Sequence, residues 1–302
     1  MKKQLLPMLL LVMLLGTMVV PAYAVDGGTI NANMTNKPEI YNEYAQILEI
    51  RDATPDKLQK MGLTEQDVNA FEQNFKDSLL TRALQSEERL EALGYSSEEI
   101  AIFQKYAEGA ELTSVELLAI SGTCTGEISR HTFTDRTVSF SYSWTWDKCP
   151  LTTTTDAAAT RWIGYDVNGY SIGLTRANRV ARIYYYKGQT YDHSTYATFQ
   201  EKLDANTESA LIPVYKVGAV PADDMYAKSG SIMITASLES GVTNSIYYVQ
   251  VAGIYGHNEL GISTPSLSIS APMAVSISYT TIGVNNIAGR QAIINASGCR
   301  YV

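Results

Sequence analysis

The side chains best suited to acid–base or metal chemistry near neutral pH are three histidines, His131, His193 and His257. The stretch Tyr191-Asp192-His193 has the composition of a general base or a metal ligand, because an aspartate can orient an imidazole ring. Neighbouring residues on a strand point to opposite faces, however, so we do not expect Asp192 and His193 to form a pair. The histidines therefore predict neither a catalytic residue nor a metal site.

Carboxylates could support a second chemistry, the hydrolysis of glycosides, which needs two carboxyl groups about 5–9 Å apart in a cleft. The chain contains no G-x-S-x-G, no H-E-x-x-H and no glycine-rich phosphate loop before a helix. We therefore expect a protein without enzymatic activity and without a cofactor. A hydrolase assembled from scattered carboxylates is a third alternative, and its candidate residues are Asp135, Asp166, Asp192 and Glu239.

The chain has three cysteines, Cys124, Cys149 and Cys299, whose spacing matches no zinc-ligand pattern. In an exported protein one disulfide bond is the natural expectation, and it would leave one odd thiol. The pairing stays open among three possibilities. A bond between Cys124 and Cys149 is the most local, whereas one between Cys124 and Cys299 would join the two ends of the second half of the chain.

A row of aromatic residues suggests binding. Between residues 181 and 186, apolar residues alternate with Arg182, Tyr184 and Tyr186, and on a strand this places the arginine and the two tyrosines on one face. Such a face could stack on sugar rings or contact a partner protein, unless a second sheet covers it. These three residues are the candidate ligand-binding residues, and the expected ligand is an extracellular protein or a carbohydrate.

Residues 260–289 contain no charged side chain and no histidine, and parts of this stretch alternate apolar residues with serine or threonine. A membrane-inserting β-hairpin needs one apolar face over about 9–11 residues per strand. The stretch roughly meets this requirement, although Pro272 interrupts it. It predicts either an ordinary hairpin or, as the alternative function, a membrane-active protein that inserts residues 260–289 after oligomerising, as pore-forming proteins do.

The N-terminus predicts where these residues would act. Two lysines precede an apolar run of 16 residues, and an A-x-A sequence follows that ends at Ala24. This order is typical of a secretory signal peptide, and the run is shorter than the ~20 residues that a membrane anchor needs. We expect cleavage after residues 1–24, a flexible polar lead over residues 25–38, and a secreted product.

Charge divides the remaining chain at about residue 121. Residues 39–120 carry 17 acidic and 7 basic side chains, whereas acidic and basic residues balance over 121–302. Because there is no basic stripe, we expect no nucleic-acid partner, and a membrane partner only under the alternative function.

Residues 39–120 have the pattern of a small acidic helical bundle. Ser96 with Glu99, and Thr113 with Glu116, have the spacing of capping boxes at helix N-termini. Residues 58–71 align with the later stretch 90–103 at a constant offset of 32, which indicates a duplicated helical hairpin. Two copies are too few for a solenoid, so we expect two hairpins that pack on each other.

Beyond residue 121 the period changes to two, most clearly over residues 137–146. Asn168-Gly169 predicts a tight hairpin turn. We expect about eight strands and one helical stretch over 194–203. The predicted fold class is therefore α+β: a helical bundle over 39–120, followed by an antiparallel β-sandwich, or a barrel-like domain, over 121–302. The predicted function is that of a secreted, non-enzymatic binding protein whose β domain faces the ligand or partner.

Overall fold

The computed structural model describes residues 40–60, 63–151, 155–200, 205–213, 224–257, 265–271, 274–279, 282–284 and 289–301. The predicted signal peptide over 1–24 and the predicted polar lead over 25–38 lie outside these residues, so secretion stays a prediction. Among the described residues, no helix is both long and apolar enough to cross a membrane.

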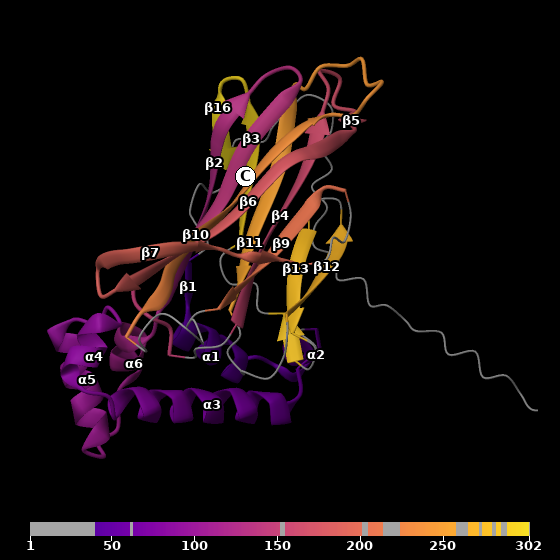
Figure 1. The fold of residues 1–302 in the computed structure, drawn as a ribbon. Coiled ribbons are helices and arrows are strands. Elements are labelled where there is room, and N and C mark those ends of the chain that lie inside the picture. The colour runs from indigo at the N-terminus through magenta and orange to yellow at the C-terminus, as the bar shows by residue number, and fades with distance from the viewer. Residues whose placement is uncertain are drawn as a thin grey trace, which may run out of the picture.

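The described residues form mainly antiparallel β-sheets (Figure 1). The first sheet has the order β1-β2-β3-β10-β6-β7, with strands β1 (Ile40–Asn42), β2 (Thr123–Phe133), β3 (Thr137–Trp146), β10 (Tyr226–Leu238), β6 (Leu174–Lys187) and β7 (Thr190–Tyr196). The second has the order β16-β15-β11-β4-β9-β8, with strands β16 (Gly298–Tyr301), β15 (Arg290–Asn295), β11 (Tyr248–Gly256), β4 (Thr155–Tyr165), β9 (Thr207–Pro213) and β8 (Thr198–Phe199).

Two smaller arrangements complete the strands. The short β5 (Ser171–Ile172) pairs with β4 through the Asn168-Gly169 turn, where Gly169 has a φ of 79°, so the predicted hairpin is confirmed. A third antiparallel sheet contains β12 (Pro265–Ala271), β13 (Ala274–Tyr279) and β14 (Ile282–Val284). The β13 backbone lies close to β11 and β4 of the second sheet.

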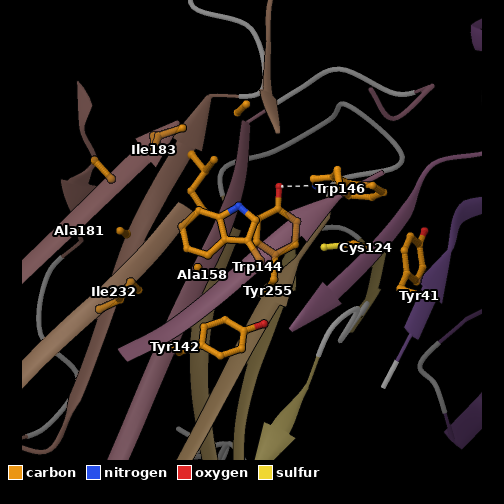
Figure 2. Packing of buried hydrophobic residues seen from close by; sticks show 14 of the residues in the cluster. Tyr41, Cys124, Tyr142, Trp144, Trp146, Ala158, Ala181, Ile183, Ile232 and Tyr255 are labelled. Carbon is orange, nitrogen blue, oxygen red and sulfur yellow. Dashed lines mark hydrogen bonds between the residues drawn. The ribbon is translucent and has the colours of Figure 1, made fainter. Parts of the chain in front are cut away.

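Alternating side chains place the core between the two large sheets. On β3, the aromatic side chains of Tyr142, Trp144 and Trp146 are all at most 1% exposed. Figure 2 shows Trp144 and Trp146 beside Tyr255 of β11, whose hydroxyl accepts a hydrogen bond of 3.2 Å from Trp146 Nε1. Gly253 on β11 has no Cβ, and one placed there would collide with the Tyr142 ring. Tyr142 can therefore pack directly on the backbone of the facing sheet.

Six helices are formed within the described residues, and they gather at one end of the sheets (Figure 1). Capping boxes begin three of them, at Thr64, Ser96 and Thr113, as expected from hydroxyl residues three positions before a carboxylate. The helices are α1 (Glu43–Arg51), α2 (Pro55–Lys60), α3 (Glu65–Ala83), α4 (Glu87–Ala92), α5 (Ser97–Ala107) and α6 (Ser114–Ile120).

Most buried apolar side chains of the helices and sheets belong to one cluster, and a second, smaller cluster within the helices contains Ile50, Leu58, Leu63 and Phe71. Phe75 and Leu79 of α3 and Phe103 of α5 belong to the same cluster as Trp146 and Tyr255 of the sheets. The chain also enters α1 directly from β1, a strand of the first sheet. The sequence-based domain division near residue 121 stays a prediction, but the apolar interior is not interrupted there.

The expected helical stretch over 194–203 is wrong where the structure describes it. Residues 190–196 form β7 and residues 198–199 form β8. Tyr196 lies opposite Arg182 of β6, and Thr195 lies opposite Ile183. Tyrosine and threonine favour strands, and pairing with a long neighbouring strand stabilises that state further.

The predicted disulfide bond is not formed either, because no such bond joins the three cysteines, all of which are described. The Cys299 thiol contacts the carbonyl oxygen of Ile128 at 3.6 Å. Ile128 lies four residues beyond Cys124 on β2, a distance of about 13 Å along a strand. The Cys299 thiol therefore contacts a part of β2 that lies away from Cys124.

Candidate functional site

The three candidate ligand-binding residues, Arg182, Tyr184 and Tyr186, lie together on the outer face of the first sheet, and each is half-buried. Their strand neighbours on β6 point inward, as Tyr185 shows: it is fully buried and stacks on the His193 ring at 5.1 Å. Burial raises the pKa of Tyr185 to about 12. The alternation on β6 therefore separates a packed face from a more open one, although Tyr186, opposite the buried Tyr226, also contacts the apolar core.

Strand β7 contributes two further tyrosines to the open face. The Tyr191 ring centroid lies 6.4 Å from that of Tyr184 and 5.8 Å from that of Tyr186. Tyr191 is 51% exposed and Tyr196 is 68% exposed. These exposures show that the face is open to solvent. We call the set Arg182, Tyr184, Tyr186, Tyr191, Tyr196 and the nearby Lys228 the tyrosine surface.

Two cations of the tyrosine surface rest on aromatic rings. The Arg182 guanidinium lies 4.8 Å from the Tyr196 ring centroid, and one of its nitrogens donates a 2.9 Å hydrogen bond to the Tyr196 hydroxyl. The Lys228 ammonium lies 5.5 Å from the Tyr186 ring centroid and donates to the Gln189 side chain. Within the described part of the chain, neither cation forms an ion pair with a carboxylate.

Neighbouring cations on the same strand behave differently. Lys187 pairs with Asp224, and both Arg176 and Arg179 pair with Glu208. Carboxylates are therefore placed beside the other cations of this part of β6. Among the described cations of β6, Arg182 alone has no carboxylate partner, and Lys228 on the neighbouring β10 has none either within the described residues.

Sequence reasoning did not include Tyr191 and Tyr196 in the binding face, since Tyr196 fell within the expected helical stretch and Tyr191 was considered only as a neighbour of Asp192 and His193. The alternation of residues 190–196 was the available signal. The expectation that Asp192 and His193 do not form a pair was wrong. A carboxylate oxygen of Asp192 lies 2.6 Å from Nδ1 of the His193 ring. A β-bulge between β6 and β7 shifts the register between Tyr191 and His193, so strict alternation fails there.

The scattered carboxylates of the hydrolase alternative have separate local environments. Asp166 accepts backbone hydrogen bonds of 2.9 Å from both Asn168 and Tyr170, and so closes its own hairpin turn. Asp192 pairs with His193 on β7, while Asp135 and Glu239 are exposed residues next to strand ends. Asp166 and Asp192 each contact a local partner, and these contacts do not bring the two carboxylates together in the way that a glycosidase requires.

The structure also contains a polar cluster inside the molecule that the sequence did not indicate. His257, which directly follows β11, lies between Asp156 of β4 and Glu43 of α1, and all three side chains are at most 2% exposed. The His257 Nδ1 atom lies 3.0 Å from both Asp156 carboxylate oxygens, and its Nε2 lies 3.4 Å from Glu43. We call Glu43, Asp156, Tyr255 and His257 the junction cluster.

The protonation of the junction cluster follows from its charges. Burial alone would lower the pKa of His257, but the carboxylates of Asp156 and Glu43 outweigh burial and raise it to about 10. His257 is therefore an imidazolium at neutral pH. The Tyr255 hydroxyl donates to Asp156, and burial together with that carboxylate raises the pKa of Tyr255.

The junction cluster joins the helices to the sheets. Glu43 accepts 2.8 Å hydrogen bonds from the backbone amides of Gly122, before β2, and Leu151, after β3. Its histidine is fully buried, so solvent and substrate cannot reach it. The arrangement stabilises buried charges, but His257 cannot act as a general base because no substrate can reach it.

No protein-family model matches the chain, and no curated protein does. Among solved structures, it is similar to AvmM, described as catalysing macrocyclization in alchivemycin A biosynthesis, with 11% identity, 57% of this chain and 87% of that chain covered, and a TM-score of 0.28. It is also similar to Clostridium perfringens delta-toxin, with 8% identity, 60% and 88% covered, and a TM-score of 0.23. Scores of this size carry no argument about fold or function.

Proposed function

We propose that this chain is a secreted, non-enzymatic binding protein, that its two packed sheets form a β-sandwich, and that the tyrosine surface contacts the ligand. The observation that carries the proposal is the set of half-exposed rings beside two cations that have no carboxylate partner among the described residues. Tyrosine and arginine dominate binding energy in many interfaces, and tyrosine buries a large area with little loss of conformational freedom.

In this proposal the helices position the binding sheet and do not bind the ligand themselves. The turn between β6 and β7 rests on the helices, since the backbone amide of Gly188 donates to the carbonyl oxygen of Ala92 at the end of α4. The tyrosine surface is thereby held at the end of the sheet nearest the helices.

The proposal is tested by applying the chain from residue 25 onward to a glycan array and to an array of extracellular proteins. The double variant Tyr184→Ala/Tyr186→Ala should lose at least about tenfold in affinity for whatever the unmodified chain retains, since each anchor side chain is worth ~1 kcal/mol or more. The matched control is Tyr170→Ala/Tyr247→Ala, which removes two exposed tyrosines outside the tyrosine surface.

The control variant should bind as the unmodified chain does. Equal retention of the Tyr184→Ala/Tyr186→Ala variant, or no specific retention by the unmodified chain on either array, would contradict the proposed function.

A second candidate function, insertion into membranes by residues 260–289, is favoured by the register of β12 with β13. The backbone pairing places Leu267 opposite Ile277, and Ser268 opposite Ser276. Apolar residues therefore face apolar residues across the hairpin, and serines face serines. Antiparallel pairing of this kind matches the alternation of strands that expose one side to lipid.

Dye release from phosphatidylcholine–cholesterol vesicles tests this candidate. If residues 260–289 insert, Ile277→Asp should abolish release, because a charge at a lipid-facing position costs about 2–4 kcal/mol near the bilayer centre. The neighbouring change Ser276→Asp places the same charge on the other side of the strand and should leave release largely intact. Intact vesicles with the unmodified chain would rule out this function.

A further inference from the structure

The tyrosine surface has a charge that indicates which ligands it fits. We propose that it binds an acidic oligosaccharide, with Arg182 and Lys228 contacting carboxylates of successive sugar units and the tyrosine rings stacking on the sugars. The inference rests on the proposed binding function of the same surface, and it adds the chemical class of the ligand.

The first argument is charge complementarity. The chain carries 31 acidic against 23 basic side chains, and the cations next to the surface on β6 are matched by carboxylates. Arg182 and Lys228 instead have a hydroxyl, an amide and ring faces as neighbours. A guanidinium in this state can form two parallel hydrogen bonds to a carboxylate, the strongest contact that it makes.

The second argument is the polar character of the residues beside the rings. Tyr184 lies in register between Ser229 of β10 and Ser194 of β7, and Arg182 lies opposite Ser231. Serine hydroxyls both donate and accept, as the hydroxyl groups of a sugar require. The centre of a protein–protein interface is instead richer in apolar side chains, so this setting favours a carbohydrate over a peptide.

The third argument is the spacing of the two cations. Arg182 and Tyr186 are four residues apart on β6, which is about 13 Å along a strand. Lys228 lies over the Tyr186 ring, so the cations mark the two ends of the row of rings. This length suits an extended oligosaccharide with more than one carboxylate. Two cations are few for a nucleic acid, whose backbone carries a charge at each nucleotide.

Calorimetric titration with tetragalacturonic acid and with its fully methyl-esterified form tests the inference, because the two probes share rings and differ in charge. The acid should bind at least about tenfold more tightly, the ratio that corresponds to one charge-assisted hydrogen bond. Arg182→Gln should remove most of this preference, and Lys228→Gln part of it. Tyr184→Ala/Tyr186→Ala should weaken both probes together.

The control is Arg136→Gln, an exposed arginine in the turn between β2 and β3, which should leave both affinities unchanged. Equal binding of acid and ester, an unchanged preference in Arg182→Gln, or tighter binding of an oligothymidylate would overturn the acidic-sugar inference. So would failure to bind tetragalacturonic acid while a protein is retained on the array in a Tyr184-dependent manner, and in that case the proposed binding function would stand.

Discussion

The junction cluster and the tyrosine surface use charged side chains in opposite ways. At the junction, the His257 imidazolium contacts two carboxylates, and Glu43 also receives two backbone amides. On the tyrosine surface, Arg182 and Lys228 contact rings, a hydroxyl and an amide. The first region is closed to solvent, whereas the second contains a tyrosine that is 68% exposed.

The comparison distinguishes charged side chains that stabilise the fold from charged side chains that are free to contact a ligand. A buried charge without partners costs several kcal/mol, so the junction can exist only with its bonds complete. A half-buried cation still contacts water and tolerates the absence of a carboxylate, and it can exchange that water for a ligand. The histidine with the most strongly altered titration is for this reason a structural residue.

The largest expected effect is that of breaking the junction cluster. Asp156→Asn removes the charge that His257 and Tyr255 contact, and it should lower the free energy of unfolding by about 3–5 kcal/mol, as loss of one partner of a buried ion pair does. The matched change is Asp192→Asn, which breaks an Asp–His pair whose side chains are 41% and 28% exposed, and it should cost less than about 1 kcal/mol. If chemical denaturation showed the same loss of unfolding free energy for both variants, the proposed difference between the buried and the exposed pair would be wrong.

The next test compares adjacent residues on β6. Tyr185→Ala should lower the free energy of unfolding by about 3–5 kcal/mol, because it empties a fully buried site. Tyr184→Ala, on the open face, should cost about 1 kcal/mol or less. If urea denaturation showed a loss of about 3–5 kcal/mol for Tyr184→Ala as well, Tyr184 would be a packing residue, and the tyrosine surface would lose its basis.

A third prediction concerns pH. Because the pKa of His257 is raised from 6.5 to about 10 by folding, its contribution to stability is complete below pH 6.5 and is lost as the pH rises through about 10. The thermal unfolding midpoint should therefore decrease as the pH is raised from neutral to 10. In His257→Gln the midpoint should start lower and fall less over this interval, and parallel pH profiles would contradict the assignment.

The smallest expected effect is on the cysteines. A reducing agent should leave the thermal unfolding midpoint unchanged, since no disulfide bond is formed. Without denaturant, a thiol reagent should modify Cys299 before Cys124, because Cys124 is fully buried at the junction and burial raises its pKa. Cys299→Ser should remove the early modification, while early labelling of Cys124 would indicate a junction that opens.

Much of the fold was predictable because it depends on neighbours in the sequence. The capping boxes at Ser96 and Thr113 and the turn at Asn168-Gly169 are local signals, and all three are present. The mostly antiparallel β character of the described residues after 121 was equally visible from alternation. Strand β7 was missed because its seven residues are stabilised by pairing with β6, which local preference does not reveal.

The two regions differ in the same respect. Arg182, Tyr184 and Tyr186 occupy one strand, so alternation alone could place them on a common face. Glu43, Asp156 and His257 come from a helix, a strand and the residue after another strand, and no spacing in the sequence relates them. A site assembled by topology can be found only once the sheets are known.

The contact between Glu43 and His257 also orders events during synthesis. The glutamate is translated early, and its imidazole partner is translated only after strands β2 to β11. The buried contacts of Glu43 at the junction can therefore be completed only once His257 has been synthesised. Docking of α1 on the sheets is therefore completed only after most of the described strands have been synthesised.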